Sequence, residues 1–291
     1  MKNYITITLL LLSTVFSFAQ DKTESTNNEE DQIIDELFNY DEIDDLVDSF
    51  SNYQFLYVSL NYSSDTYFSG RDIGINQYNL IPQITYFNSN GLFASLSGIY
   101  YSAFVPKWDY TSVTVGYGKS FGKFKSMRYF VDYTRYIYSN SLDNLYQNNI
   151  EAALTIHNKK NNLGSQLSVN YLFGTEQSII LSSRNFATFK LFKTKKSTLN
   201  FKPQVNITFG QQTIELAQTL NIGGSQVTNY LQNKVFDLIN TQVQLPLQLN
   251  TNDFDFELGY NINLPAALGQ ETNLSTNGFF NFSMAYLFDL K

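Results

Sequence analysis

The stretch STLNFKPQVNITFG, residues 197–210, alternates apolar and polar side chains. The apolar parity carries Leu199, Phe201, Val205 and Ile207, and the polar parity carries Thr198, Lys202, Gln204, Asn206 and Thr208. A period of two predicts a β-strand with one apolar and one polar face, which Pro203 weakens because it has no N–H to donate. In a soluble sandwich the apolar face would point into the protein, whereas in a membrane barrel it meets lipid and the polar face lines the inside.

The same alternation recurs along the rest of the chain. We predict strands at residues 52–62, 78–87, 91–103, 109–119, 123–138, 146–158, 162–173, 177–192, 196–209, 234–250, 253–263 and 278–290. They are long for soluble strands, which average ~5–6 residues, and long enough for tilted membrane strands of ~9–11 residues. Short connectors such as 88–91 alternate with longer ones such as 63–77, as in outer-membrane barrels with short periplasmic turns.

The apolar parity of these strands is rich in aromatic side chains. In the last strand it reads Phe280, Phe282, Met284, Tyr286, Phe288 and Leu290. Large rings at strand ends are typical of the two membrane interfaces, and Trp108 is predicted to be an interfacial anchor. The alternative, a soluble secreted β-sandwich or barrel, would have to bury one face of all twelve strands. We therefore predict an all-β fold, an antiparallel transmembrane up-and-down β-barrel of about 12 strands over residues 51–291.

The N-terminal segment MKNYITITLLLLSTVFSFAQ has the pattern of a secretory signal peptide. Lys2 gives a basic start, residues 5–16 are mostly apolar, and Ser17 and Ala19 fit a cleavage site after Ala19. A membrane anchor would need ~20 apolar residues, more than this run offers. We predict a cleaved signal over residues 1–19 and export to the cell outer membrane.

Cysteine is absent and His157 is the one histidine in the sequence. Lipid attachment at a cysteine, thiol catalysis and thiolate or multi-histidine metal sites are thereby excluded, and we predict no cofactor. His157 ends a strand that leads into a short turn, and neither GxSxG nor HExxH occurs. We predict that the protein is not an enzyme.

The net charge of −7 averages two unlike regions. Residues 21–50 contain twelve acidic side chains and one basic side chain, whereas residues 51–291 contain 14 acidic and 17 basic ones. No basic stripe indicates nucleic-acid binding. Within residues 33–50 apolar residues recur at three- and four-residue steps and predict a short acidic amphipathic helix. The residues of this predicted partner or plug segment are Ile33, Leu37, Phe38, Ile43, Leu46 and Phe50.

Several roles stay open for this acidic periplasmic segment, residues 20–50. It can pack on the barrel or act as a linker, plug the lumen, or dock another exported protein. Its charge argues against binding to anionic membrane surfaces, which select Lys and Arg.

Charged residues of both signs fall on the polar parity of the strands. We predict that they line the lumen: Arg128, Asp132, Glu151, Arg184, Lys190, Lys202 and Glu257. They would form either an internal ion-pair network or the lining of an aqueous path. About twelve strands lie between filled eight-stranded barrels and open porins of ~16 strands or more, so a narrow or plugged lumen is expected.

The longest connector is expected at residues 210–233. Its apolar residues Ile214, Leu216, Leu220 and Ile222 favour a short helix before Gly223-Gly224. A connector of this length is usually functional or disordered, so it is a candidate constriction or a candidate contact for a partner.

The chain resembles the small outer-membrane β-barrel proteins of the Bacteroidota. The resemblance is carried by the signal ending Phe18-Ala19-Gln20, the heavy use of Tyr, Phe and Asn, YFSGRDIG at 67–74, and FFNFSMAYLFDL at 279–290. Many such terminal strands end in an aromatic residue, whereas this chain ends Asp289-Leu290-Lys291. The resemblance implies insertion into outer-membrane lipid and leaves two functional hypotheses. One is a narrow channel or transporter for small solutes, and the other is a non-enzymatic structural subunit of a larger outer-membrane or periplasmic protein assembly.

Overall fold

The structure is a computed structural model that describes residues 54–122, 126–139, 145–222, 225–251, 254–268, 271 and 274–290. Side chains are described throughout these ranges except at 212–222 and 225–235. The strands are β1 (Gln54–Ser63), β2 (Tyr67–Phe68), β3 (Arg71–Asp72), β4 (Asn79–Asn88), β5 (Leu92–Tyr101), β6 (Trp108–Phe121), β7 (Met127–Tyr138), β8 (Tyr146–His157), β9 (Leu163–Gly174), β10 (Gln177–Ala187), β11 (Phe189–Lys193), β12 (Ser197–Phe201), β13 (Gln204–Ile222), β14 (Ser225–Thr251), β15 (Phe254–Pro265) and β16 (Asn277–Asp289). Within the described ranges, no helix has the length and apolar character needed to cross a membrane.

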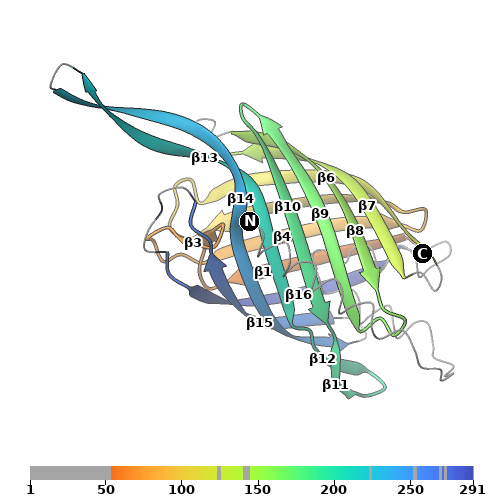
Figure 1. Ribbon diagram of the computed structural model, residues 1–291. Coiled ribbons are helices and arrows are strands. Elements are labelled where there is room, and N and C mark those ends of the chain that lie inside the picture. The colour runs from red at the N-terminus through yellow and green to blue at the C-terminus, as the bar shows by residue number, and fades with distance from the viewer. Residues whose placement is uncertain are drawn as a thin grey trace.

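The strands form a closed antiparallel barrel (Figure 1). Successive strands of the barrel pair with each other, and β2 and β3 form a separate hairpin. β1 closes the ring by pairing with β16 from Phe55↔Asp289 to Ser63↔Asn281. β10 and β11 are successive parts of one barrel strand interrupted at Thr188, and β12 and β13 are parts of another interrupted at Lys202 and Pro203. The ring therefore has twelve strands, which confirms the predicted fold class. The predicted N-terminal acidic helix lies outside the described residues.

Two of the sequence-based strands differ from those in the structure. The strand predicted over 177–192 is broken at Thr188, and the one over 196–209 is broken where Pro203 removes a backbone donor. Beyond this break, β11 pairs with β12, and β12 pairs with the last residues of β14. The β11–β12 hairpin extends the short-turn end of the barrel (Figure 1).

The helix predicted within residues 210–233 is wrong. β13 and β14 continue as a long hairpin, paired from Gly210↔Asp237 out to Ile222↔Ser225, and Figure 1 shows it projecting past the barrel. The four apolar residues that favoured a helix all have even numbers, so they match a period of two as well as a helical spacing. Pairing with β14 gives the backbone groups on one edge of β13 partners along its whole length to Ile222.

The barrel turns its polar face inward and its apolar face outward. Asn200 and Gln248 are both 0% exposed, whereas Phe280 is 58% and Leu258 is 55% exposed. The same orientation holds in the segment 197–208, where Thr198, Lys202 and Gln204 are buried. A soluble barrel would have the opposite arrangement, because water does not favour a broad exposed apolar band. The apolar band is what lipid requires of a transmembrane barrel.

Aromatic side chains border the apolar band at both ends. Near the long loops, the rings of Tyr62 and Tyr78 are 5.8 Å apart, and Trp108 lies exposed at the start of β6. Near the short turns, Phe254 and Tyr286 are 4.9 Å apart. Two such girdles are the arrangement that membrane interfaces favour.

Candidate functional site: the barrel interior and its external cap

The described residues of the interior line two polar cavities, of about 350 and about 330 Å³. The first lies against β4–β9 and the second against β1, β10 and β13–β16, with Ile81 on both walls. Serine, threonine, asparagine and glutamine make up most of both linings. Such side chains offer both hydrogen-bond donors and acceptors, so the interior suits water and small polar solutes.

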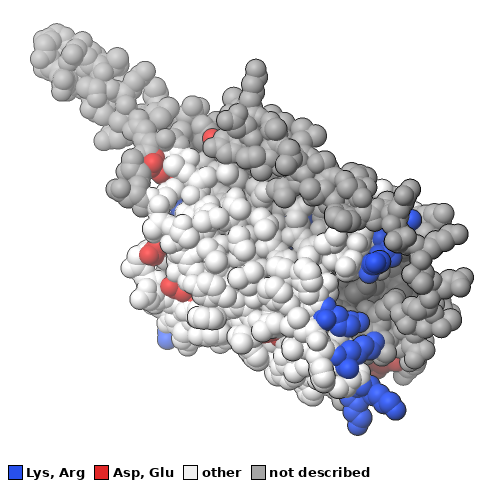
Figure 2. Space-filling view, turned by 60° about the horizontal axis from the view of Figure 1, so that its bottom comes forward, with Lys and Arg blue, Asp and Glu red and all other residues white. Residues whose placement is uncertain are grey.

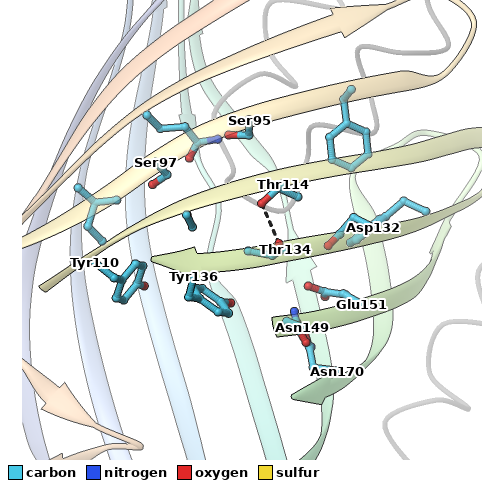
Figure 3. A pocket seen from close by; sticks show the side chains of 15 residues that line it. Ser95, Ser97, Tyr110, Thr114, Asp132, Thr134, Tyr136, Asn149, Glu151 and Asn170 are labelled. Atoms are coloured by element: carbon cyan, nitrogen blue, oxygen red, sulfur yellow. Dashed lines mark hydrogen bonds between the residues drawn. The ribbon is translucent and has the colours of Figure 1, made fainter. Parts of the chain in front are cut away.

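The first cavity has an acidic wall. Asp132 of β7 and Glu151 of β8 are direct cross-strand neighbours, and Figure 3 shows them beside Asn149 and Asn170. Asn149 donates to the Asn170 side chain over 2.8 Å, and the hydroxyls of Thr114 and Thr134 are 2.7 Å apart. The wall therefore combines carboxylates with amides and hydroxyls held in fixed positions.

The second cavity is lined mainly by amides. Glu257 of β15 accepts hydrogen bonds from Gln248 over 3.1 Å and from Asn281 over 2.8 Å. Arg184 of β10 lies on the wall of the same cavity. Two amides thus hold one carboxylate in place, which limits how far the Glu257 side chain can move.

Aromatic and basic side chains gather at the short-turn end of the interior. The ring of Phe186 lies 5.0 Å from the Lys202 ammonium, 5.4 Å from the Arg184 guanidinium and 5.5 Å from the ring of His157. Both distances to the cations are within the range of cation–π attraction. Phe186 sits directly over Gly164 of β9, where a Cβ atom would collide with the ring. A residue with a side chain at position 164 would therefore displace the whole cluster.

Six of the seven charges predicted to line the lumen are on its inner face. Arg128, Asp132, Arg184 and Lys202 are buried, and Glu151 and Glu257 are half-buried on cavity walls. Arg128 donates from Nε to the Ser120 hydroxyl over 3.1 Å. Lys190 differs: it is exposed on β11, because the strand break at Thr188 carries this segment past the point where other strands surround it.

The residues predicted to form the partner or plug segment lie outside the described residues: Ile33, Leu37, Phe38, Ile43, Leu46 and Phe50.

An external cap covers part of the opposite mouth. It consists of residues 64–78, which include the β2–β3 hairpin, and the described part of the β15–β16 connection. Ser69 and Gly70 form the two-residue turn with φ of 52° and 78°, and a positive φ at both positions is typical of a type I′ turn. Gly70 lies against the Asn240 side chain of β14, and its carbonyl accepts from Asn277 over 2.7 Å. Phe68 contacts Phe104 beyond β5, so the cap reaches from β5 to β14.

A bidentate ion pair fastens the cap. Arg71 donates from Nε to Glu271 over 3.0 Å and from Nη2 over 2.8 Å, and a second bond from Nη2 reaches the Ala266 carbonyl over 2.8 Å. The backbone N–H of Leu268 also donates to Glu271, over 2.8 Å. These bonds lower the pKa of Glu271 below its ordinary value, the hydrogen bond from Arg71 being the main cause. Nearby, burial and then the neighbouring Asp65 carboxylate raise the pKa of Tyr67 to about 12, so Tyr67 stays protonated and donates to Asp65.

No protein-family model and no curated protein matches the chain. Among solved structures, it is similar to the NanC porin, at 13% identity and a TM-score of 0.44 over 79% of this chain and 98% of the porin. It is also similar to an outer-membrane channel from Pseudomonas putida F1, at 10% identity and a TM-score of 0.46 over 83% of this chain and 98% of the channel. A third similar structure is the translocator domain of the autotransporter NalP from Neisseria meningitidis, at 10% identity and a TM-score of 0.41 over 84% of this chain and 92% of that domain. Similarities at these identities and TM-scores give no information about the function of this chain. Its fold is assigned from the pairing of its own strands.

The external cap is the part of the site that sequence reasoning missed. The segment YFSGRDIG was noted as part of a resemblance, yet its Ser69-Gly70 turn between an aromatic residue and Arg71 is also a hairpin signal. The partner of Arg71 lies 200 residues away, and nothing local in the sequence marks it.

In the described side chains, no group of three or more His, Cys, Asp or Glu is placed to hold a metal ion.

We predict that Arg71→Gln and Glu271→Gln each loosen the cap. Either variant removes the ion pair, which is partly exposed and should contribute at most about 1 kcal/mol, so amide hydrogen exchange at residues 66–72 should rise by up to about fivefold. The double variant should exchange no faster than Arg71→Gln, which also loses the bond to the Ala266 carbonyl. Arg135→Gln, on the exposed outer side of β7, is the matched control, and equal exchange in all variants would contradict this role.

The same cap should open in acid. Because the folded-state pKa of Glu271 is depressed, the stability that the ion pair contributes is present above the unfolded pKa and is lost as pH falls through the folded value. The protection factors at residues 66–72, which correct the exchange rates for their intrinsic pH dependence, should therefore fall in the wild type as the pH drops below the ordinary glutamate pKa of about 4.3, and the Glu271→Gln variant should show no such step.

Proposed function

We propose that the protein is an outer-membrane β-barrel that forms a narrow passage for small polar solutes, and that it is not an enzyme. The observation that carries this proposal is the polar lining of both interior cavities, on a barrel whose outer face is apolar. A filled structural barrel would pair its interior polar groups with one another, because unpaired polar groups there are costly, whereas these cavities leave room beside the polar groups for water or a solute. A predicted signal peptide over residues 1–19 supports delivery to that membrane.

The interior favours small solutes over large ones. Aromatic rings of Phe87 and Phe93, 6.4 Å apart, narrow the short-turn half, and the external cap narrows the other mouth. Between these two constrictions each cavity is at the low end of the volumes that hold small molecules in proteins, which suits solutes such as a sugar or an amino acid. Carboxylates on one wall and Arg184 on another would orient a solute that carries charge or a strong dipole.

The test is permeation through liposomes that contain the purified barrel. Swelling rates in a series of uncharged sugars should fall steeply with sugar size. Ser112→Trp places an indole in the first cavity and should slow swelling several-fold, because Ser112 is a buried lining residue. Val113→Trp, one residue along and facing outward, is the matched control and should leave the rate unchanged. Swelling no faster than in empty liposomes, or equal effects of both variants, would contradict a passage through this lumen.

The projecting hairpin favours a second candidate, a subunit of a larger membrane assembly. β13 has 19 residues and β14 has 27, whereas each of the other uninterrupted strands of the ring has 14 or fewer. The part of the hairpin between about residues 213 and 234 therefore extends well past the barrel edge, as Figure 1 shows. A long exposed pair of strands is a feature that partner proteins recognise by edge pairing or surface contact.

Shortening the hairpin separates this role from permeation. Replacing residues 213–234 by Asn-Gly closes the strands at the Gln212↔Val235 pair with a favoured two-residue turn. If the hairpin binds partners, gentle detergent extraction of the native protein should yield a complex with companions in fixed ratio, and the shortened variant should lose them while keeping its heat-dependent migration on SDS gels. An unchanged set of companions would contradict the role.

A further inference from the structure

The two interior cavities differ in the charges on their walls. Among the described residues that line the first cavity, Asp132 and Glu151 carry carboxylates and none is Lys, Arg or His. In the second cavity, Arg184 lies on the wall together with Glu257. Charge of one sign on the low-dielectric wall of a cavity attracts ions of the opposite sign, so the first cavity favours cations.

Strand register holds these two carboxylates side by side. Asp132 of β7 pairs directly with Glu151 of β8, which in turn pairs with Asn170 of β9. Like charges directly opposite each other on neighbouring strands repel, and a cation between them would relieve that repulsion. On its other side Asp132 pairs with Gly116 of β6, where a Cβ atom would collide with the ring of Phe93. An aromatic ring therefore lies beside the carboxylate pair.

Two buried amides on the same lining have used their donors and kept an acceptor. Asn149 is 6% exposed, and its Nδ2 donates to Asn170, whereas its Oδ1 has no hydrogen-bond partner among the described residues. Gln83 on the wall formed by β4 is 5% exposed, its Nε2 donates to Thr85 over 2.7 Å, and its Oε1 likewise has no partner there. An unpaired buried acceptor is costly, so these oxygens favour a ligand that donates hydrogen bonds.

Aromatic rings supply the remaining surface of the cavity. Phe93 and Phe130 belong to the lining, and Figure 3 shows Tyr110 and Tyr136 at the end away from Asp132, with ring centroids 5.2 Å apart. Aromatic faces attract organic cations as well as apolar carbon. A hard metal ion would instead need about six oxygen ligands around it. Carboxylates and amide oxygens beside rings therefore suit an ammonium group attached to a carbon chain better than a metal ion.

The long-loop mouth of the barrel has an excess of negative charge. Figure 2 shows Lys and Arg side chains gathered at the short-turn end, whereas Asp and Glu lie mostly toward the other end. The described basic residues at the long-loop end are Arg71, Lys107 and Arg135. The described carboxylates there are Asp65, Asp72, Asp109, Glu176, Asp237 and Glu271. Such an excess around an opening raises the local concentration of cations.

We propose that the first cavity is a binding site for a small organic cation that carries a primary ammonium group. Asp132, Glu151 and the Asn149 Oδ1 would accept the three N–H bonds of the ammonium, and its carbon chain would pack against Phe93 and Phe130. As the solute class of the passage, such amines rest on the proposed function. Binding itself needs only the cavity, and it is measured without permeation.

Titration calorimetry on the full-length mature protein in an uncharged detergent tests this proposal. The probe is n-butylammonium chloride, and 1-butanol and sodium butyrate are the neutral and anionic compounds of the same chain length. The amine should give saturable binding, and the alcohol and the acid should give none. The affinity for the amine should fall only modestly as salt rises, because a partly buried charge pair is screened less than an exposed one.

Isosteric variants locate the site. Asp132→Asn and Glu151→Gln should each lower the affinity for butylammonium about tenfold, because each removes a charge-assisted hydrogen bond. Asn149→Leu keeps the size of the side chain, removes its carbonyl oxygen, and should lower the affinity about threefold. Asp289→Asn removes an exposed carboxylate at the short-turn end and should leave the affinity unchanged. Heat-dependent migration on SDS gels verifies that each variant is a folded barrel.

Three results would overturn the proposal. Absence of saturable butylammonium binding, or equal binding of 1-butanol, would show that the cavity does not recognise the ammonium group. Wild-type affinity in both Asp132→Asn and Glu151→Gln would place the bound amine elsewhere. Calcium chloride that binds more tightly than the amine and displaces it would assign the carboxylates to a metal ion. Calorimetry reports binding and liposome swelling in uncharged sugars reports passage, so failure of this site is distinct from failure of the proposed function.

Discussion

Ring closure between β1 and β16 is the interaction on which the rest of the structure depends. Lipid offers no partner for a backbone N–H or C=O, so a sheet can span a membrane only if its two edges pair with each other. Nine consecutive residues of β1, from Phe55 to Ser63, pair with β16, and the Gln54 carbonyl extends the contact to Leu290. Once the ring is closed, the parity of each strand decides which side chains meet lipid and which share the interior.

The interior that results is filled only in part by side chains, which leave two polar cavities among the described residues. Rings stacked over glycines, such as Phe186 over Gly164, occupy the short-turn half. Amides and hydroxyls line the middle, and the external cap, fastened by Arg71 and Glu271, lies over the long-loop mouth. Among the described residues, exposed lysines are more numerous at the short-turn end and carboxylates at the long-loop end. The interior is thus bordered by different groups at its two ends.

Much of this fold follows from local patterns in the sequence. Alternation with a period of two is independent of distant contacts, so the twelve strands and their inward polar parity were predictable. The β13–β14 hairpin was not, because Ile214, Leu216, Leu220 and Ile222 satisfy both strand and helix spacing and only pairing with β14 decides between them. The exposure of Lys190 depends on a break at Thr188, and the Arg71–Glu271 ion pair joins residues that only the closed ring brings together.

The most direct test of the account asks which face of a strand touches lipid. Trp108 is the one tryptophan in the sequence, so Trp108→Phe gives a background into which a single indole can be placed at Val131 or at Phe130, neighbours in the middle of β7. Val131 is exposed on the outer face, and Phe130 lines the first cavity. In vesicles of lipid brominated along the acyl chains, Val131→Trp fluorescence should be strongly quenched and Phe130→Trp fluorescence should not. Quenching of Phe130→Trp alone, or of neither, would contradict an apolar face turned to lipid around a polar interior.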